Sequence, residues 1–280
     1  MNGGPTTEVI NCPFCSGPES EYWTKENGFT AVKCSDCGLV YVNPRPIATL
    51  IDEAVKTGVH SDVDHGRTAI VRRAASNVRV YEKIFSSMYS DVWERTTPIS
   101  WLDIGAGYGE VIEAVANLAP QGSTIEGLEP MEPKRNAARK RGLAMREGYL
   151  SDVKSRYDFV SLVNVYSHIP NFHEFLKDLK KVLSVGGEFF VETGNIGDLD
   201  AREVPSELDL PDHLVFAGEK NIEDYLTNAG FEIIEFRRRR KDGVINFAKN
   251  IGKKMIGRQV NLTLPYTSRY RSIMIRAALT

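Results

Sequence analysis

Hydrophobic and polar positions follow two different periods along the chain, and from residue 99 onward these periods alternate. Short continuous apolar runs, such as "ISWLDIG" at 99–105 and "YDFVSLVNV" at 157–165, are typical of strands covered on both faces. Between them lie segments with apolar residues at every third or fourth position, such as "GEVIEAVANLA" at 109–119, which predict amphipathic helices. This alternation predicts an α/β fold with a seven-stranded, mostly parallel sheet and helices on both faces.

The two ends of the chain depart from this alternation. No comparable helix separates "FEIIEFRR" at 231–238 from "RSIMIRAAL" at 271–279, so we expect these two strands to form an antiparallel pair. Residues 47–92 are expected to be mainly helical, with helical spacing clearest at 65–92, and the polar stretch "TGVHSDVDHG" at 57–66 is either a lid over a ligand or a linker. We therefore expect a small module at 1–46, a helical linker or lid at 47–98 and a main domain at 99–280.

The composition is that of a packed globular protein, with 42% hydrophobic residues among 280 and a formal net charge of -2. No apolar run reaches the ~18 residues of a spanning helix. The first residues, "MNGGPTTEVIN", lack a basic region followed by an apolar core, so no signal peptide is expected. A cytoplasmic, reducing location is the resulting expectation.

The charge is distributed unevenly. Residues 236–280 contain 12 Lys and Arg but a single acid, Asp242, so this tail carries +11. Apolar residues interleaved with these cations predict a basic amphipathic helix within 237–258. That helix either makes peripheral contact with an anionic surface or is a solvated helix between the last two strands.

All four cysteines lie in the first 37 residues, in the pairs "CPFC" (Cys12, Cys15) and "CSDC" (Cys34, Cys37). Two residues between thiolates let one tight turn present both sulfurs to one metal, and two such turns predict a closed tetrahedral zinc site. Four thiolates leave no open position for water, so we interpret the zinc as structural. Two disulfides or free thiols are the alternatives, and disulfides conflict with the expected reducing location.

The loop "DIGAGYGE" at 103–110 raises the question of what approaches its backbone so closely. A triphosphate-binding loop would need Lys followed by Ser or Thr after the last glycine, where this chain has Glu110. A dinucleotide would place its pyrophosphate at the next helix N-terminus, where the Glu110 carboxylate repels phosphate. S-adenosylmethionine carries no phosphate, and Glu129, at the end of the second strand, is placed to accept its two ribose hydroxyls.

These stretches resemble a known family. "LDIGAGYG", "GLEP" and "FVSLVNVYSHIPN" are similar to the cofactor-binding motifs of class I S-adenosylmethionine-dependent methyltransferases, which have a Rossmann-like sheet, and the resemblance covers about residues 99–280. "CPFC…CSDCGLVYVNPRP" resembles the zinc ribbon that precedes this domain in sugar, polysaccharide and antibiotic-pathway methyltransferases. The resemblance implies the following cofactor-binding residues: Asp103, Gly105, Ala106, Gly107, Gly109, Glu129, Pro130, Gly148, Tyr149 and Asn164.

Two histidines are candidates for the general base that a hydroxyl acceptor would need. The resemblance places the acceptor just beyond the fourth strand, where His168 lies, and His213 lies on the loop after the fifth strand. Packing beneath the loop is the alternative role for each. Among other residues near these loops, Tyr166 and Tyr108 either orient a substrate or pack, and His173 is expected on a helix surface.

Three functions remain open at this point. The first is O-methylation of a sugar, glycan or other small-molecule hydroxyl. The second is RNA methylation, as in the ribosomal RNA methyltransferases with a zinc ribbon, but residues 1–37 hold two lysines against five acids, which disfavours nucleic acid. The third is a cofactor-binding scaffold without turnover. The oligomeric state and the methylated atom are not predicted.

Overall fold

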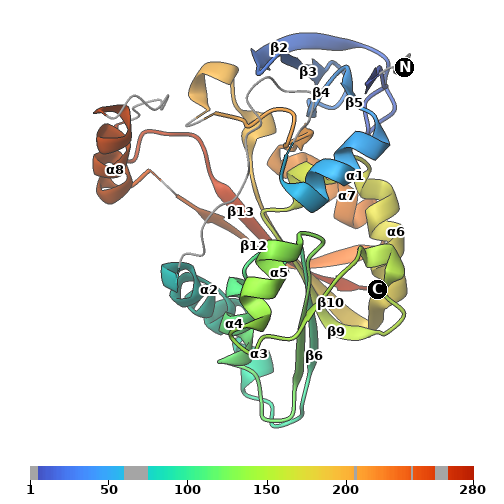
Figure 1. The fold of residues 1–280 in the computed structure, drawn as a ribbon, viewed down its shortest axis with the longest axis vertical. Coiled ribbons are helices and arrows are strands. Elements are labelled where there is room, and N and C mark those ends of the chain that lie inside the picture. The colour runs from blue at the N-terminus through green and yellow to red at the C-terminus, as the bar shows by residue number, and fades with distance from the viewer. Residues whose placement is uncertain (1–5, 60–74, 205–206, 241, 256–263) are drawn as a thin grey trace.

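The computed structural model of the chain describes residues 6–59, 75–204, 207–240, 242–255 and 264–280. Its main feature is a seven-stranded sheet, which confirms the predicted fold class (Figure 1). The strands follow the order β12 (Phe231–Arg239), β13 (Ser272–Leu279), β10 (Leu183–Gly194), β9 (Tyr157–Val163), β6 (Ser100–Ile104), β7 (Thr124–Leu128) and β8 (Met145–Arg146). Only β13 runs antiparallel to its neighbours, β10 and β12, and it lies between them. The predicted antiparallel pair is therefore confirmed.

Helices cover both faces of this sheet because side chains on each strand alternate between the faces. On β6, Trp101 packs in one cluster with α2 (Ala75–Met88), α3 (Ser90–Trp93) and α4 (Glu110–Ala116). The next residue, Leu102, belongs to the cluster on the opposite face, which α6 (Phe172–Val182) and α7 (Glu219–Asn228) cover. A further helix, α5 (Glu132–Arg139), packs beside β8.

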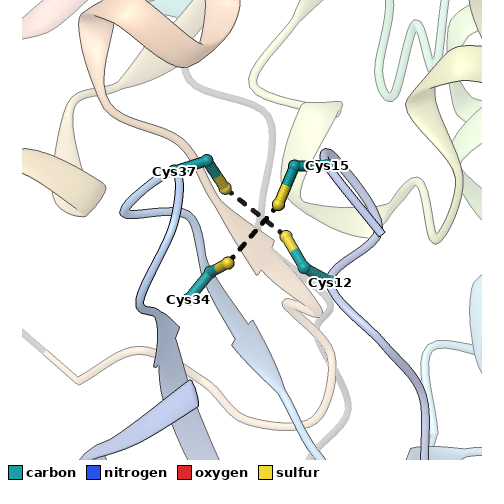
Figure 2. A group of neighbouring side chains, drawn as sticks. All are labelled: Cys12, Cys15, Cys34 and Cys37. Carbon is teal, nitrogen blue, oxygen red and sulfur yellow. Dashed lines mark hydrogen bonds between the residues drawn. The ribbon is translucent and has the colours of Figure 1, made fainter. Parts of the chain in front are cut away.

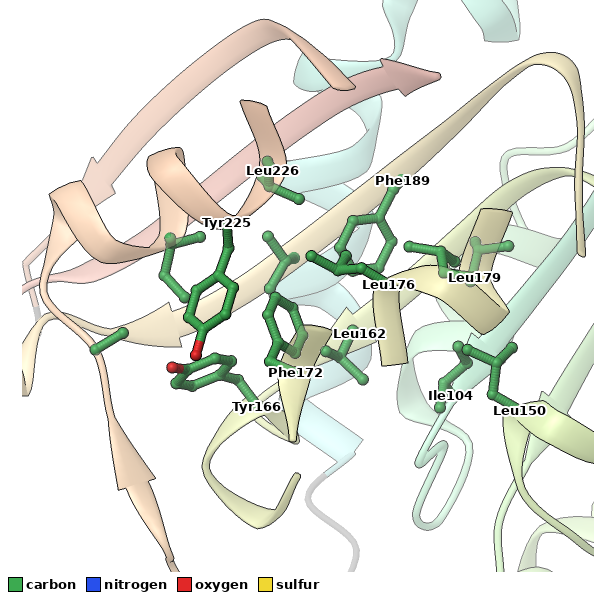
Figure 3. Packing of buried hydrophobic residues seen from close by; sticks show 14 of the residues in the cluster. Ile104, Leu150, Leu162, Tyr166, Phe172, Leu176, Leu179, Phe189, Tyr225 and Leu226 are labelled. Atoms are coloured by element: carbon green, nitrogen blue, oxygen red, sulfur yellow. The ribbon is translucent and has the colours of Figure 1, made fainter. Parts of the chain in front are cut away.

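Tyr166 belongs to the hydrophobic cluster that α6 and α7 cover. Figure 3 shows its ring packed between the side chains of Phe172 and Tyr225, with the two tyrosine hydroxyls facing one another. Tyr166 is only 1% exposed. Its role is therefore core packing, and the option that it orients a substrate is not supported.

The N-terminal module folds on a four-stranded sheet of order β11-β4-β3-β2. The strands β2 (Ser20–Glu26) and β3 (Phe29–Cys34) form a hairpin, whose turn residues Asn27 and Gly28 both have positive φ, 49° and 86°. β4 (Val40–Val42) follows, and β1 (Thr7–Glu8) pairs with β5 (Arg45–Pro46). The fourth strand, β11 (Val215–Phe216), comes from the main domain and was not predicted.

The segment between the two modules begins with α1 (Ala48–Thr57), which ends at Gly58 with φ 74°. The rest of the predicted lid, with His60 and His65, and the start of the predicted helix at 65–74 lie outside the described residues. Short 3₁₀ turns complete the fold: η1 (Leu150–Asp152), η2 (Tyr166–His168), η3 (Ile196–Asp198) and η4 (Ala201–Glu203).

Part of the basic tail forms α8 (Val244–Met255), a helix that lies between β12 and β13 in chain order (Figure 1). The side chains of Ile251 and Met255 are exposed. The arginines just before the helix, Arg237, Arg238 and Arg239, form ion pairs within the chain, with Glu235, Glu219 and Glu192. These arginines are thus not available as free cations, and contact of 237–258 with an anionic surface stays a prediction.

Across the described ranges, no helix combines the length and apolar character needed to cross a bilayer.

Candidate active site

A cavity of about 960 Å³ lies at the carboxyl ends of β6, β7 and β9. Open parallel sheets bind their ligands at this edge. The loops that follow these strands supply one wall of the cavity. The helix before the main domain, α1, and the loop at 209–213 supply much of the rest. The predicted cofactor residues on its surface are Gly105, Gly107, Glu129, Pro130, Gly148, Tyr149 and Asn164.

The glycines in the loop after β6 differ in how much space surrounds their Cα atoms. Gly105, Gly107 and Gly109 all have positive φ, 67°, 55° and 84°. A Cβ on Gly107 would meet no atom within 4 Å, so this backbone faces open space, as close approach of a ligand requires. A Cβ on Gly109 would lie 2.6 Å from Leu143 Cδ1, so this glycine makes room for packing instead.

Asp103, Ala106 and Gly109 were also predicted to bind the cofactor, but the cavity lining does not include them, so their contact with the cofactor stays a prediction. Ala106 is buried and closes on Gly127, where a Cβ would come within 2.7 Å of the Ala106 methyl. Asp103 is 2% exposed and accepts a hydrogen bond from Ser161 Oγ, which itself accepts one from Trp101 Nε1 at 2.9 Å. All three support the loop from beneath.

The surroundings of the Asp103 carboxyl raise its pKa well above the usual value for an aspartate. Burial raises its pKa to about 8, the hydrogen bond from Ser161 opposes this shift, and the negative charge of Glu129 adds to it. A carboxyl beneath the glycine loop therefore carries a proton near neutral pH and can ionise in response to a cation above it.

Glu129 directly follows β7 and connects two loops through hydrogen bonds. Its Oε2 accepts the Gly107 N–H at 2.7 Å and its Oε1 accepts the Met131 N–H at 2.8 Å. Each carboxylate oxygen has a second lone pair for a ligand hydroxyl. The residue predicted to bind ribose thus also fixes the loop that the cofactor approaches.

The helix α1 is pinned to the main domain across the cavity. Tyr149 Oη donates to Asp52 Oδ1 at 2.6 Å, and Lys56 Nζ lies 2.7 Å from Asp52 Oδ2. These two hydrogen bonds hold the pKa of the Asp52 carboxyl below its usual range. Ile51 and Asp52 line the cavity, so α1 supplies part of the cover that the sequence placed at 57–66. An acid and a tyrosine so far apart gave no sequence signal.

His168 and His213 meet on the cavity surface, with ring centroids 4.6 Å apart. His168 lies on η2 after β9, and His213 lies two residues before β11. Asp212 adds a carboxylate, and one nitrogen or oxygen from each of the three residues lies within 4.8 Å of the others. The sequence predicted both histidines, but not Asp212 beside them.

Hydrogen bonds set the tautomer of both rings. His168 Nδ1 lies 2.8 Å from the Asp212 carbonyl oxygen, and His213 Nδ1 lies 2.6 Å from the Leu208 carbonyl oxygen. A carbonyl oxygen only accepts, so each Nδ1 carries the hydrogen and each neutral ring keeps Nε2 as its proton acceptor. Both rings are thus in the form that a general base needs.

The surroundings of His168 decide how readily that ring accepts a proton. Burial lowers the pKa of His168 from 6.5 to about 4, and the positive charge of His213 when protonated lowers it further, against the opposing effect of Asp212. The fold favours the neutral ring. His168 is therefore a weak proton acceptor at neutral pH.

We expect an NMR titration of the His168 ring to give a midpoint near 4. Because this pKa is depressed, the contribution of His168 to stability is complete above about pH 6.5 and is lost as the pH falls toward 4. A denaturation series over that range, compared with His168→Gln, measures the loss. A titration midpoint near 6.5 would show that burial does not control this ring.

Other candidate residues have structural roles. His173 is not simply a surface residue, because its Nε2 donates to the Phe14 carbonyl at 2.8 Å and its ring contacts Tyr225. It therefore anchors the first cysteine turn to α6. Tyr108 offers its carbonyl to the guanidinium of Arg141, and the cavity surface does not include it.

The four cysteine sulfurs converge on one point (Figure 2). Sγ of Cys12 lies 3.5 Å from that of Cys37, and Sγ of Cys15 lies 3.5 Å from that of Cys34. These separations exceed a disulfide bond of about 2.05 Å and approach the ~3.8 Å expected between thiolates around a tetrahedral zinc ion. The donor set fits a structural zinc.

Comparison with known proteins agrees with this geometry. The sequence profile described as "Methyltransferase domain" matches residues 79–236. The ubiquinone biosynthesis O-methyltransferase of Proteus mirabilis (strain HI4320) is 26% identical over 101 residues, which are 34% of this chain. That match spans 41% of the relative's own length.

Solved structures show the same fold. Geranyl diphosphate C-methyltransferase from Streptomyces coelicolor A3(2), crystallised with S-adenosyl-L-homocysteine, has a TM-score of 0.58 at 13% identity and covers 83% of this chain and 99% of its own. A putative sarcosine dimethylglycine methyltransferase from Galdieria sulphuraria has a TM-score of 0.55 at 14% identity, covering 81% and 93%. Since the family match spans more than half of the chain, this protein belongs to the methyltransferase-domain family.

Proposed function

We propose that the protein transfers a methyl group from S-adenosylmethionine to a hydroxyl of a sugar, glycan or other small molecule. The observation that carries this proposal is the pair His168 and His213, which lines the same cavity as Gly107 and Glu129. The Proteus relative is a ubiquinone biosynthesis O-methyltransferase, which supports an oxygen acceptor.

The cofactor end of the cavity suits a ligand that carries positive charge and no phosphate. When bound, S-adenosylmethionine supplies an activated methyl group on a sulfonium. Glu129 would accept its ribose hydroxyls, and the Gly105–Gly107 backbone would lie against its amino-acid part. Glu129 gives this region negative potential, and Asp103 beneath the loop can ionise when a cation binds, which together favour an ammonium and a sulfonium.

At the other end of the cavity, a histidine prepares the acceptor. His213 Nε2 would take the proton of the acceptor hydroxyl, whose oxygen would then receive the methyl group that the bound cofactor supplies. The proton then leaves His213 to water. We assign the base to His213 because a pKa of about 4 makes His168 a poor proton acceptor. His168 would then position the hydroxyl.

The size of the cavity favours a small acceptor. Pockets for drug-sized ligands measure roughly 300–1,000 Å³, so about 960 Å³ accommodates the cofactor and a sugar-sized molecule. RNA remains the alternative acceptor, but the acidic N-terminal module does not offer the basic surface that RNA would need. A scaffold without turnover would have no use for two histidines in the same base-competent tautomer.

An assay that does not assume the acceptor tests the proposal. The protein is incubated with labelled S-adenosylmethionine and cell extracts separated into RNA, protein, glycan and small-molecule fractions. We expect label in the glycan or small-molecule fraction, in an ether linkage that resists mild base. Label confined to RNA, or no label in any fraction, would contradict the proposal.

We further propose that Cys12, Cys15, Cys34 and Cys37 hold one structural zinc ion per chain, on the basis of the sulfur geometry. A module of about 45 residues gains much of its folding free energy from such a metal. Cys34→Ser is expected to lower the zinc content below one per chain and to expose the hairpin to proteolysis. Elemental analysis with limited proteolysis measures both, and zinc-free wild-type protein would contradict the assignment.

A further inference from the structure

We propose that Glu26, at the end of the N-terminal hairpin, is a positioning residue for His213, so that the zinc-bearing module sets the geometry of the acceptor site. This inference rests on the proposed function only for the role of His213. The contacts that carry it stand independently of the acceptor's identity.

The Glu26 side chain binds the backbone of the loop before His213. Its Oε2 accepts the Leu208 N–H at 2.8 Å, and its Oε1 accepts the Asp209 N–H at 2.8 Å and the Leu210 N–H at 3.3 Å. One carboxylate thus accepts hydrogen bonds from three consecutive backbone amides, which lie more than 180 residues away in the sequence. Hydrogen bonds to an ionised acceptor are the strong class, and they fix the direction of each peptide plane.

The neighbouring turn residue completes the contact. Asn27 Nδ2 donates to the Leu210 carbonyl oxygen at 2.8 Å, and Asn27 itself lines the cavity. The amide and the carbonyl of Leu210 are therefore both bound by the hairpin tip. The β2–β3 turn acts as a wall of the active site as well as a turn.

The same loop peptides hold the catalytic ring. His213 Nδ1 donates to the Leu208 carbonyl oxygen at 2.6 Å, and the His213 backbone N–H donates to the Asp209 carbonyl oxygen at 3.2 Å. Glu26 accepts hydrogen bonds from the Asp209 and Leu210 N–H groups, which share their peptide planes with the Leu208 and Asp209 carbonyls. The carboxylate therefore controls the carbonyl that sets the tautomer and direction of the His213 imidazole.

The hairpin is in turn fixed by the cysteine end of the module. Cys34 ends β3 and pairs with Ser20, while Glu26 pairs with Phe29 at the turn, so one ladder joins the cysteine cluster to the hairpin tip. Beyond His213, β11 pairs with β4. Both ends of the 208–216 segment are consequently attached to the N-terminal module.

Substitution of Glu26 separates positioning from general stability. Glu26→Gln keeps one carbonyl acceptor and Glu26→Ala keeps none, so we expect effects in the order wild type, Gln, Ala. Amide hydrogen exchange at Leu208–Leu210 should rise by about 10-fold or more, as expected for loss of charge-assisted hydrogen bonds. The His213 ring resonances should shift. Glu21→Gln, an exposed acid on the same strand, is the matched control and should change neither.

The kinetic arm uses the holoprotein and an acceptor that wild type methylates. We expect Glu26→Ala to lower kcat by about 100-fold, since misplacement by about 1 Å has effects of that size. The dissociation constant for S-adenosylmethionine and the zinc content should stay at wild-type values.

Two results would overturn the inference: unchanged exchange and unchanged His213 resonances in Glu26→Ala, or a loss of cofactor affinity that parallels the loss of kcat. Failure of the proposed function has a different signature. Wild type would then methylate no hydroxyl acceptor, while the exchange and NMR measurements would still decide whether Glu26 positions the loop.

Discussion

Glu129→Ala is expected to weaken binding of S-adenosylmethionine by at least about 100-fold. Two hydrogen bonds from ribose hydroxyls to a carboxylate, at about 1.5–3 kcal/mol each, give a loss of this size. The substitution also releases the Gly107 and Met131 N–H groups that the carboxylate accepts, so the glycine loop loses its tie to β7. Isothermal titration calorimetry with S-adenosylmethionine and S-adenosylhomocysteine measures the change.

Glu132→Ala is the control for this experiment. Glu132 is an exposed acid three residues further on, at the start of α5, and its substitution removes one negative charge without touching the cavity. We expect it to leave the affinity within about twofold, because exposed charges contribute little. Equal affinities for wild type and Glu129→Ala would remove Glu129 from the cofactor site.

The parts of the fold that the sequence predicted are those with a repeated signal. Apart from the two-residue β8, the strands of the sheet are longer apolar runs separated by amphipathic helices, so the sheet and its reversed strand β13 were predicted. The spacing of the cysteine pairs predicted that four sulfurs would converge. His168 and His213 follow strands whose carboxyl ends meet at one edge, so their meeting also follows from the strand order.

The sequence does not distinguish one glycine from another. In the "GAGYG" loop, Gly107 faces open space and Gly109 makes room for Leu143, although both have positive φ. Asp103 precedes the loop in the position expected for a ligand contact, yet the strand pleat turns its carboxyl toward Ser161. The difference depends on neighbours that the local sequence does not contain.

Long-range contacts with short elements also escaped prediction. β11 has two residues, Val215 and Phe216, and two residues cannot show a period. Its pairing with β4 brings the N-terminal module to the cavity, where Asn27 and α1 become part of the wall. The active site is thus built from both modules, which no motif in either one indicated.

His213→Ala is expected to lower kcat by about 10²–10⁴-fold, the usual effect of removing a general base. The reason is geometric first: the ring lines the cavity with Nδ1 bound to the Leu208 carbonyl, which leaves Nε2 to take the proton. Cofactor affinity should stay near the wild-type value, because the predicted cofactor contacts come from Glu129 and Gly107, on other loops than His213. Single-turnover kinetics on the identified acceptor, with calorimetry in parallel, measure both quantities.

His168→Ala is the matched comparison, since this histidine lines the same cavity in the same tautomer but is held to a pKa of about 4. A base so weak accepts a hydroxyl proton poorly, so its removal should affect the acceptor KM more than kcat. If His168→Ala instead shows the large fall in kcat and His213→Ala does not, the two roles are exchanged. Both variants could instead keep more than about a tenth of wild-type kcat. A loss of less than about 10-fold is smaller than the smallest expected general-base effect of about 100-fold, so neither histidine would be the base and alignment alone would account for methyl transfer.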